Sequence, residues 1–249
     1  MAVGNSLSGR ANATAQNRAN AITKYESNGA EITLTPAIVR NYLVSGDKER
    51  VTFEELAMFI NLCKYSGLNP WLREAYCIKY GNEPATMVVG KDAFAKRAES
   101  NPAYDGMESG IITLDKQSGE ITYRNGTVKL PGEEILGGWA EVWRKDRNHT
   151  TRAEVSFEEY AGRKKDGSMN GQWSKKPATM IRKVAQVQAL REAFPTMLSG
   201  AVTAEEAGAE ESNETAMPIQ QPVINAETGE VEEPKAQAPA PVQGDVGII

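Results

Sequence analysis

The spacing of apolar residues changes twice along this chain, and this change limits the folds that it can adopt. Between residues 53 and 63 apolar side chains recur every three or four positions, as in a helix. Between residues 74 and 155 short β-prone runs alternate with turns, and helical spacing returns from Pro177 to Phe194. Strands grouped between helices, rather than alternating with them, predict an α+β fold in which a central antiparallel β-sheet or set of hairpins packs against helices.

Capping signals give the bounds of the early helices. Thr52 and Glu55 have the spacing of a capping box, and Gly67 is typical of a helix end. Thr35-Pro36 predicts the start of a shorter helix that reaches about Tyr42.

The middle of the chain predicts hairpins. Gly81-Asn82 is the expected turn of the first one, and residues 146–149 are the expected turn of the last. Residues 91–99 predict a helix between the hairpins, and residues 162–176, rich in Gly, Lys and Ser, predict a loop. The predicted strands are 74–80, 85–89, 106–114, 120–124, 137–143 and 150–155.

Both ends of the chain differ in composition from its body. Residues 1–30 are polar, without an apolar period, and predict a flexible arm. Residues 201–249 contain ten acidic residues and one basic residue, with many Pro, Ala and Gln and no aromatic side chain. Such a tail buries too little apolar surface to offset its ordering entropy, so we expect it to be disordered. Residues 31–200 are then the folded domain.

The folded part carries an excess of positive charge that the acidic tail masks in the net charge of −5. Between Trp139 and Gly200 there are twelve Lys or Arg residues against seven Asp or Glu. Tryptophans and glutamines are interleaved with them. This composition suits a polyanion, because cations bind phosphates, aromatic faces stack on bases and amides reach sugar and base edges.

Catalytic residue types are scarce. His149 is the single histidine, and no nucleophile motif accompanies it. Cys63 and Cys77 are too few for a zinc site or a disulfide framework, and both are expected to be free thiols. Gly90-Lys91 lacks the first glycine and the Ser or Thr of a phosphate-binding loop. We therefore expect no enzyme activity, no cofactor and no metal.

Three basic regions are candidate binding sites, and each has a structural alternative. The cluster from Arg144 to Asn148 and the loop from Arg163 to Lys165 are either binding segments or solvated turns. In the late helix, Arg182 and Gln186 lie one turn apart on one face. Arg191 falls beside the apolar stripe, where its charge must be paired or point into a groove.

The tryptophans divide in the same way. Trp139 and Trp143 share a strand face and are expected in the core, as is Trp71. Trp173 lies in the predicted loop beside Lys175 and Lys176, so it is the best candidate for stacking on a base.

Five motifs occur here in an order that resembles the RecT/Redβ family of phage single-strand annealing recombinases. The resemblance covers roughly residues 50–200. The motifs are Gly67-Leu68-Asn69-Pro70-Trp71, Val88-Val89-Gly90, Trp143-Arg144-Lys145-Asp146-Arg147-Asn148-His149, Trp173-Ser174-Lys175-Lys176-Pro177, and Met180-Ile181-Arg182 with residues 188–194.

This resemblance implies a protein that binds single-stranded DNA, anneals complementary strands without ATP and forms rings or helical filaments on DNA. A basic groove would hold the annealed duplex intermediate. The resemblance also implies a phage exonuclease as partner. Trp173 and Gln188 would line or support the DNA groove. The candidate DNA-binding residues are Lys91, Arg144, Lys145, Arg147, Asn148, Trp173, Lys175, Lys176, Arg182, Lys183, Gln186, Gln188 and Arg191.

The alternative is a passive single-strand-binding or scaffold protein without annealing activity. The acidic tail has three interpretations: a solubilising segment, an imitation of DNA that occupies the groove when no strand is present, or a segment that recruits a host single-strand-binding protein as a further partner. No signal peptide or membrane-spanning run is recognisable, so we expect the cytoplasm of a bacterial host, with a phage or prophage as the source.

Overall fold

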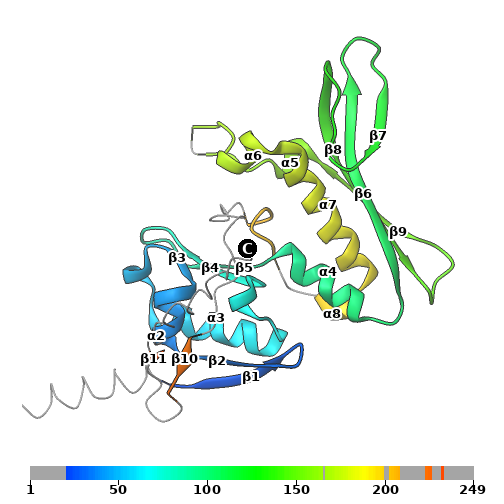
Figure 1. Ribbon diagram of the computed structural model, residues 1–249. Coiled ribbons are helices and arrows are strands. Elements are labelled where there is room, and N and C mark those ends of the chain that lie inside the picture. Colours follow the sequence, from blue (N-terminus) through cyan, green and yellow to red (C-terminus); the bar gives the residue numbers. More distant parts are fainter. Residues whose placement is uncertain (1–20, 165, 199–201, 208–221, 226–230, 233–249) are drawn as a thin grey trace, which may run out of the picture.

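The larger sheet of the protein is antiparallel, with strand order β7-β6-β8-β9 (Figure 1). The computed structural model describes residues 21–164, 166–198, 202–207, 222–225 and 231–232. The helix α7 lies across one face of this sheet, and α5, α6 and α8 flank it. The bounds are β6 Tyr104–Asp115, β7 Ile121–Asn125, β8 Glu133–Arg144, β9 Thr151–Ser156, α5 Phe157–Tyr160, α6 Gly171–Lys175, α7 Pro177–Ala193 and α8 Pro195–Leu198.

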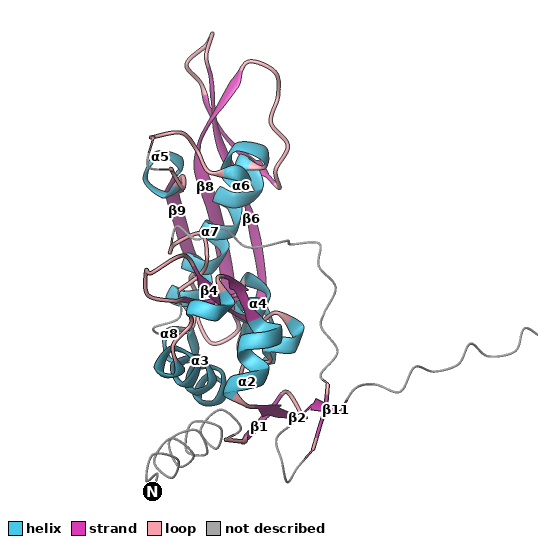
Figure 2. Ribbon diagram, turned by 90° about the vertical axis from the view of Figure 1, so that its left-hand side faces the viewer, coloured by secondary structure: helices cyan, strands magenta, loops and turns pink. Residues whose placement is uncertain are grey.

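The second part of the fold precedes the larger sheet in sequence. It contains a β1–β2 hairpin and a three-stranded sheet of order β3-β4-β5, in which β3 pairs parallel to β4 and β4 antiparallel to β5. Figure 2 shows α3 and α4 packed around this small sheet. The bounds are β1 Thr23–Ser27, β2 Ala30–Leu34, α2 Pro36–Ile38, a π-turn Val39–Leu43, β3 Val44–Gly46, a 3-10 turn Lys48–Arg50, α3 Phe53–Ser66, a 3-10 turn Pro70–Leu72, β4 Ala75–Lys79, β5 Thr86–Val89 and α4 Lys91–Ser100. Further on, β10 Val223–Ile224 pairs with β11 Val231–Glu232.

One hydrophobic core joins the two parts. Phe59 of α3, Phe94 of α4 and Ile181 of α7 are all fully buried within it. The sheet approaches α7 closely because β8 carries glycine there: a Cβ on Gly138 would lie 2.6 Å from the carbonyl oxygen of Ile181. The predicted α+β fold is confirmed.

The capping predictions are confirmed in detail. The Thr52 hydroxyl accepts a hydrogen bond from the Glu55 amide, and the Glu55 carboxylate accepts one from the Thr52 amide. Gly67 ends α3 in the left-handed conformation, with φ of 57°. Thr35 caps α2, which begins at Pro36. The predicted hairpins appear as β4–β5 and β8–β9.

The predicted flexible arm ends too late in the sequence. Residues 23–34 form the β1–β2 hairpin, whose turn is Asn28-Gly29. The Tyr25 hydroxyl donates a hydrogen bond to the Leu68 carbonyl (2.7 Å) and the Ser27 hydroxyl donates one to the Gly67 carbonyl (2.7 Å). These bonds fix the hairpin to the end of α3. The rest of the predicted arm, residues 1–20, lies outside the described residues.

The predicted disordered tail is also corrected at its start. Thr203, Ala204 and Glu205 are buried, and the Val202 carbonyl accepts a hydrogen bond from the Val89 amide of β5 (2.9 Å). Low overall hydropathy concealed this short segment, which contains its own apolar and capping residues. Residues 208–221, 226–230 and 233–249 of the predicted tail lie outside the described residues. Across the described ranges, no helix is long and apolar enough to cross a bilayer.

The capping box of α3 continues into a buried ion pair. Lys79 Nζ on β4 lies 2.7 Å from Glu55 Oε1, and both side chains are largely buried. Burial alone would raise the pKa of Glu55. Hydrogen bonds from Lys79 and from the backbone amides of Thr52 and Ala85 outweigh it and lower this pKa to about 2.

The Glu55→Gln variant should lose about 3 kcal/mol of unfolding free energy at neutral pH, because it leaves the Lys79 ammonium buried without its counterion. A depressed folded pKa stabilises above the unfolded value, and this contribution fades as the pH falls from 4.5 towards about 2. Urea unfolding of both proteins at a series of pH values should therefore converge in acid. Glu54→Gln is the matched control, because Glu54 is exposed in the same helical turn. An equal loss in both variants would contradict the role of the buried pair.

Candidate nucleic-acid interface

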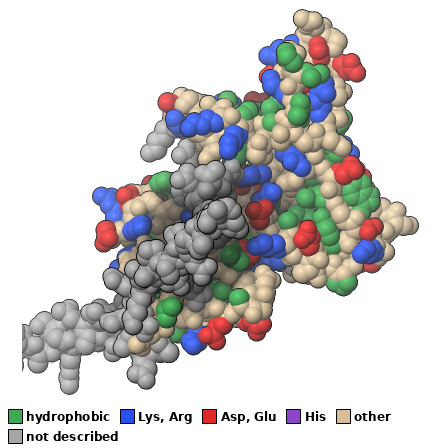
Figure 3. Space-filling model, in the orientation of Figure 1, with side chains coloured by type: hydrophobic (Ala, Val, Ile, Leu, Met, Phe, Trp, Pro, Cys, Tyr) green, Lys and Arg blue, Asp and Glu red, His purple; other side chains and the backbone are tan. Residues whose placement is uncertain are grey.

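The helix α7 is the centre of the candidate interface, since it brings most of the predicted cations into one region. Figure 3 shows Lys and Arg side chains gathered over α6 and along α7. The predicted apolar stripe of this helix is confirmed, with every member buried. The stripe is Met180, Ile181, Val184, Val187, Leu190 and Phe194.

Arg182 and Gln186 lie on one face of α7, as predicted, and share a partner on the sheet. The hydroxyl of Ser109 on β6 accepts hydrogen bonds from Arg182 Nε (3.0 Å) and Gln186 Nε2 (2.8 Å). Gln186 is 8% exposed, so it braces the arginine and lies too deep to track a backbone. Among the described residues, no acceptor is bonded to the two terminal nitrogens of Arg182. Arg182 is thus oriented through Nε with donors left for a ligand.

Arg191 is paired with a carboxylate, which was one of the two arrangements expected for its charge beside the apolar stripe. Its Nη1 and Nη2 lie 3.0 and 2.8 Å from the two oxygens of Glu206, a bidentate pair. Its guanidinium also lies over the Phe94 ring of α4. Burial would raise the pKa of Glu206, but hydrogen bonds from Arg191 and from the Thr203 amide outweigh it and hold this pKa below its usual range.

Two further predicted residues contact the same segment of the tail. Lys183 Nζ is 3.5 Å from Glu205. Gln188 Nε2 donates hydrogen bonds to Glu206 Oε1 (2.8 Å) and to the Tyr160 hydroxyl (3.3 Å). Residues 205 and 206 therefore bring two carboxylates to the cationic side of α7.

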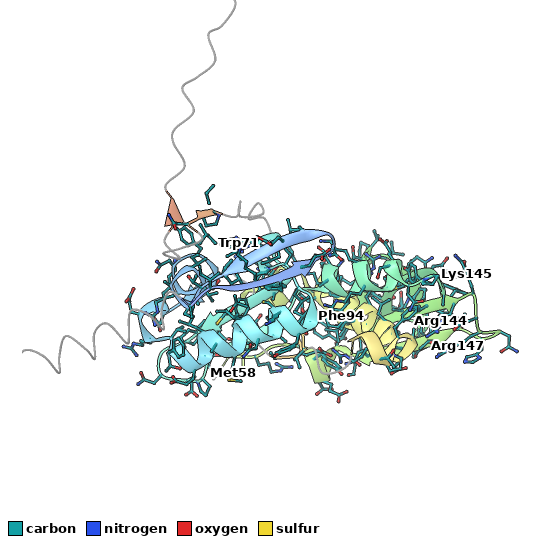
Figure 4. The ribbon with its side chains drawn as sticks, turned by 90° about the horizontal axis from the view of Figure 1, so that it is seen from below. Met58, Trp71, Phe94, Arg144, Lys145 and Arg147 are labelled. Atoms are coloured by element: carbon teal, nitrogen blue, oxygen red, sulfur yellow. The ribbon has the colours of Figure 1, made fainter. Side chains whose placement is uncertain are left out.

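The turn after β8 forms a second group of cations at the C-terminal end of α7. Figure 4 shows Arg144, Lys145 and Arg147 together, away from Met58 on α3. Arg144 braces the turn: it pairs with Asp146 through two hydrogen bonds (2.8 and 2.6 Å) and stacks on the Phe194 ring. Its hydrogen bonds lower the pKa of Asp146.

The outer residues of this turn face solvent. Lys145, Arg147 and Asn148 are exposed, and within the described part of the chain the Arg147 side chain makes no hydrogen bond or ion pair. Together with Trp143, Arg144 and other residues of the turn, Arg147 and Asn148 line an open hollow of about 510 Å³. An aromatic face beside guanidinium and amide groups is chemically suited to a nucleotide.

Trp173 is not available for stacking, which corrects the prediction made from its neighbours. The predicted loop contains the short helix α6, capped by Asn170, and the Trp173 side chain is 1% exposed. Its ring packs edge-on against Phe157, with ring centroids 5.7 Å apart. Trp173 is a support residue, while Lys175 and Lys176, at the junction of α6 and α7, are exposed.

Lys91 and the other tryptophans have structural surroundings. Lys91 begins α4 and lies 3.3 Å from Asp92. Trp71 and Trp139 are buried, as predicted, and Arg152 lies over the Trp139 ring. Trp143 is half-buried beside the hollow, so its predicted place in the core is wrong.

The segment from Gly67 to Trp71 is structural. The side-chain oxygen of Asn69 caps the 3-10 turn by accepting a hydrogen bond from the backbone amide of Trp71 (3.0 Å). The backbone amide of Asn69 donates a hydrogen bond to the buried Glu74 carboxylate (2.8 Å). Glu74 in turn pairs with Lys96 of α4 at 2.7 Å. This network fixes the corner between α3 and β4 on which α4 rests.

Sequence reasoning missed four residues that hold the predicted cations in place. Ser109 and Phe94 carry no sequence signal for this role, because their partners are distant in the chain. Glu206 had one: Thr203 and Glu206 have the spacing of a capping box, and their mutual hydrogen bonds are present. Glu205 is its neighbour in that turn. Among the described residues, no group of three His, Cys, Asp or Glu side chains could hold a metal ion.

Fold and site together define an α+β protein whose central helix carries anchored cations. Residues 30–218 match the RecT family, and the chain belongs to that family. The members of this family are single-strand annealing proteins.

Two curated proteins are similar to this chain. It is 29% identical over 145 residues to an uncharacterized protein of Ureaplasma parvum serovar 3, an alignment covering 58% of this chain and 56% of the relative. It is 26% identical over 160 residues to the recombination protein bet of Escherichia phage lambda, covering 63% of this chain and 52% of the relative. The chain thus spans about half the length of the curated relatives it matches.

The Trp173→Ala variant should lose about 3–5 kcal/mol of unfolding free energy, because it empties a fully buried site between α5 and α7. Lys175→Ala, two residues away and exposed, should change stability by less than about 0.5 kcal/mol. Urea denaturation followed by circular dichroism measures both. A stable Trp173→Ala protein would restore the stacking interpretation.

Proposed function

We propose that this protein binds single-stranded DNA and anneals complementary strands during phage homologous recombination. The observation that carries the proposal is the match of residues 30–218 to the RecT family. The oriented Arg182 and the exposed Lys145, Arg147, Lys175 and Lys176 support it, because they supply cations for a phosphate backbone.

The mechanism follows from the kind of contact that these cations make. Phosphate contacts hold a strand and set its position but carry no sequence information. A strand held by its backbone keeps its bases available for a second strand, so Watson–Crick pairing supplies the specificity. Annealing by this route consumes no ATP, because duplex formation is itself favourable.

The assembly and the partners belong to the same proposal. Copies of the protein would line up along one strand as a ring or a helical filament. A phage exonuclease would expose the strand, a host single-strand-binding protein would hand it over, and the work would take place in the cytoplasm of the bacterial host.

Binding should weaken steeply with salt. If about six phosphates are neutralised per protomer, log K should fall with log salt at a slope of roughly −4 to −5 on single strands. Arg147→Ala should make this slope shallower by about 0.7, because it removes one phosphate contact. Fluorescence anisotropy with a labelled oligonucleotide, at about 50 to 300 mM salt, measures both slopes. Lys64→Ala, an exposed cation on α3, should leave the slope unchanged. A wild-type slope near zero would reject the interface.

Arg182→Ala should lose annealing while the fold survives. Removing one charge-assisted contact per protomer should slow annealing about tenfold or more. Ser109 keeps its hydrogen bond to Gln186, so stability should change by about 1 kcal/mol or less.

The assay mixes two complementary oligonucleotides, one carrying a fluorophore and the other a quencher, with protein and no nucleotide cofactor. Wild-type protein should accelerate duplex formation, and Lys64→Ala should behave like wild type. Wild-type rates for Arg182→Ala would exclude this residue from the interface. Sequestration of the strands by the wild-type protein would instead support a passive single-strand-binding function.

A further inference from the structure

Residues 202–206, which we call the strap, contact both parts of the fold. On one side, the Val202 carbonyl pairs with the Val89 amide of β5, and Ala204 packs in a small cluster with Ile78 and Val88. On the other side, Glu205 and Glu206 reach α7. In Figure 1 the strap is the gold segment between β5 and α7.

The strap carries acidic groups to cations that a DNA strand would need. Arg191 grips the Glu206 carboxylate with two parallel hydrogen bonds, the same geometry with which guanidinium binds phosphate. Gln188 adds a third bond to Glu206. The strap thus places a carboxylate in an anion-binding site.

The two carboxylates of the strap differ in how well their oxygens are hydrogen-bonded. Glu206 accepts hydrogen bonds from Arg191, Gln188 and the Thr203 amide. Glu205 is 4% exposed, yet its Oε1 has no hydrogen-bond partner among the described residues, and Lys183 Nζ stays 3.5 Å away. A buried carboxylate oxygen without a hydrogen bond is unfavourable. Release of the strap returns this group to water, which makes the strap suited to exchange.

We propose that the strap is an internal competitor of the DNA strand: its carboxylates occupy Lys183, Gln188 and Arg191 until phosphates displace them. This regulation rests on the function proposed above, since Lys183, Gln188 and Arg191 lie on α7, the helix that carries Arg182. A DNA strand that binds must first displace the strap from these side chains. The strap therefore weakens the binding of a short strand that contacts a single protomer. The competing explanation is a permanent brace that stays in place when DNA binds.

Substitution of the gripped carboxylate separates competition from a general charge effect. Glu206→Gln should bind a short oligo-dT about three- to tenfold more tightly than wild type, which corresponds to a strap closed in about 70–90% of molecules. Glu192→Gln is the matched control: it removes the same charge from an exposed position on α7, beside Arg191. It should show only the small general increase that one lost negative charge produces.

Hydrogen exchange on the wild-type protein gives an independent test that needs no variant to fold. The amides of Val89 and Ala207 donate hydrogen bonds to the strap, to the Val202 and Thr203 carbonyls respectively. Saturating oligo-dT should make both amides exchange faster, against the usual protective effect of a ligand. Unchanged or slower exchange means a permanent brace and overturns the proposal.

The outcomes distinguish this proposal from the function on which it rests. If the wild-type protein ignores oligonucleotides even at low salt, the proposed function and the strap proposal both fail. If it binds and anneals, but Glu206→Gln and Glu192→Gln have equal affinities, the strap proposal alone fails.

Discussion

The burial of α7 on nearly every side is the constraint on which the rest of this structure depends. The sheet approaches one face of the helix so closely that only glycine fits at position 138 of β8, next to the backbone of Ile181. Phe94 of α4 and the strap meet other faces. A buried helix must give each of its polar side chains a partner. The partners of Arg182, Gln186 and Arg191 are therefore requirements of packing, and they also determine where each cation points.

This constraint divides the predicted cations by role. Arg144 and Arg191 are anchored by two hydrogen bonds to one carboxylate and by an aromatic ring, so each also contributes to the joints between elements. Lys145 and Arg147 are held only by the backbone of their turn and stay exposed. Arg182 is intermediate, with one nitrogen committed to Ser109. A single count of basic residues could not separate these groups, because they differ only in tertiary surroundings.

The sequence predicted the elements whose signals are local. Thr52 with Glu55, the Gly67 helix end and the apolar spacing of α7 each act within a few residues, and each is present in the fold. Two equally local signals escaped notice because composition argued against them. Asn28-Gly29 is a favoured hairpin turn inside a segment that looked featureless, and Thr203 with Glu206 is a capping box inside an acidic tail. The average composition of a segment therefore does not predict its structure where a signal of two to four residues, such as a turn or a capping box, is enough to order the chain.

The prediction failed for Trp173 for a different reason. Its Gly- and Lys-rich neighbours indicate a solvated loop, and among them Lys164, Gly167, Lys175 and Lys176 are exposed. The indole nevertheless turns inward onto Phe157, beside the backbone of Gly162. This buried aromatic ring packs α6 against Phe157 of α5, and in doing so it positions Lys175 and Lys176 at the start of α7. The exposed lysines and the buried ring beneath them thus belong to one motif, in which tryptophan supplies the packing that positions the lysines at the surface. Adjacency in sequence is therefore no reason to assign the two residue types the same role.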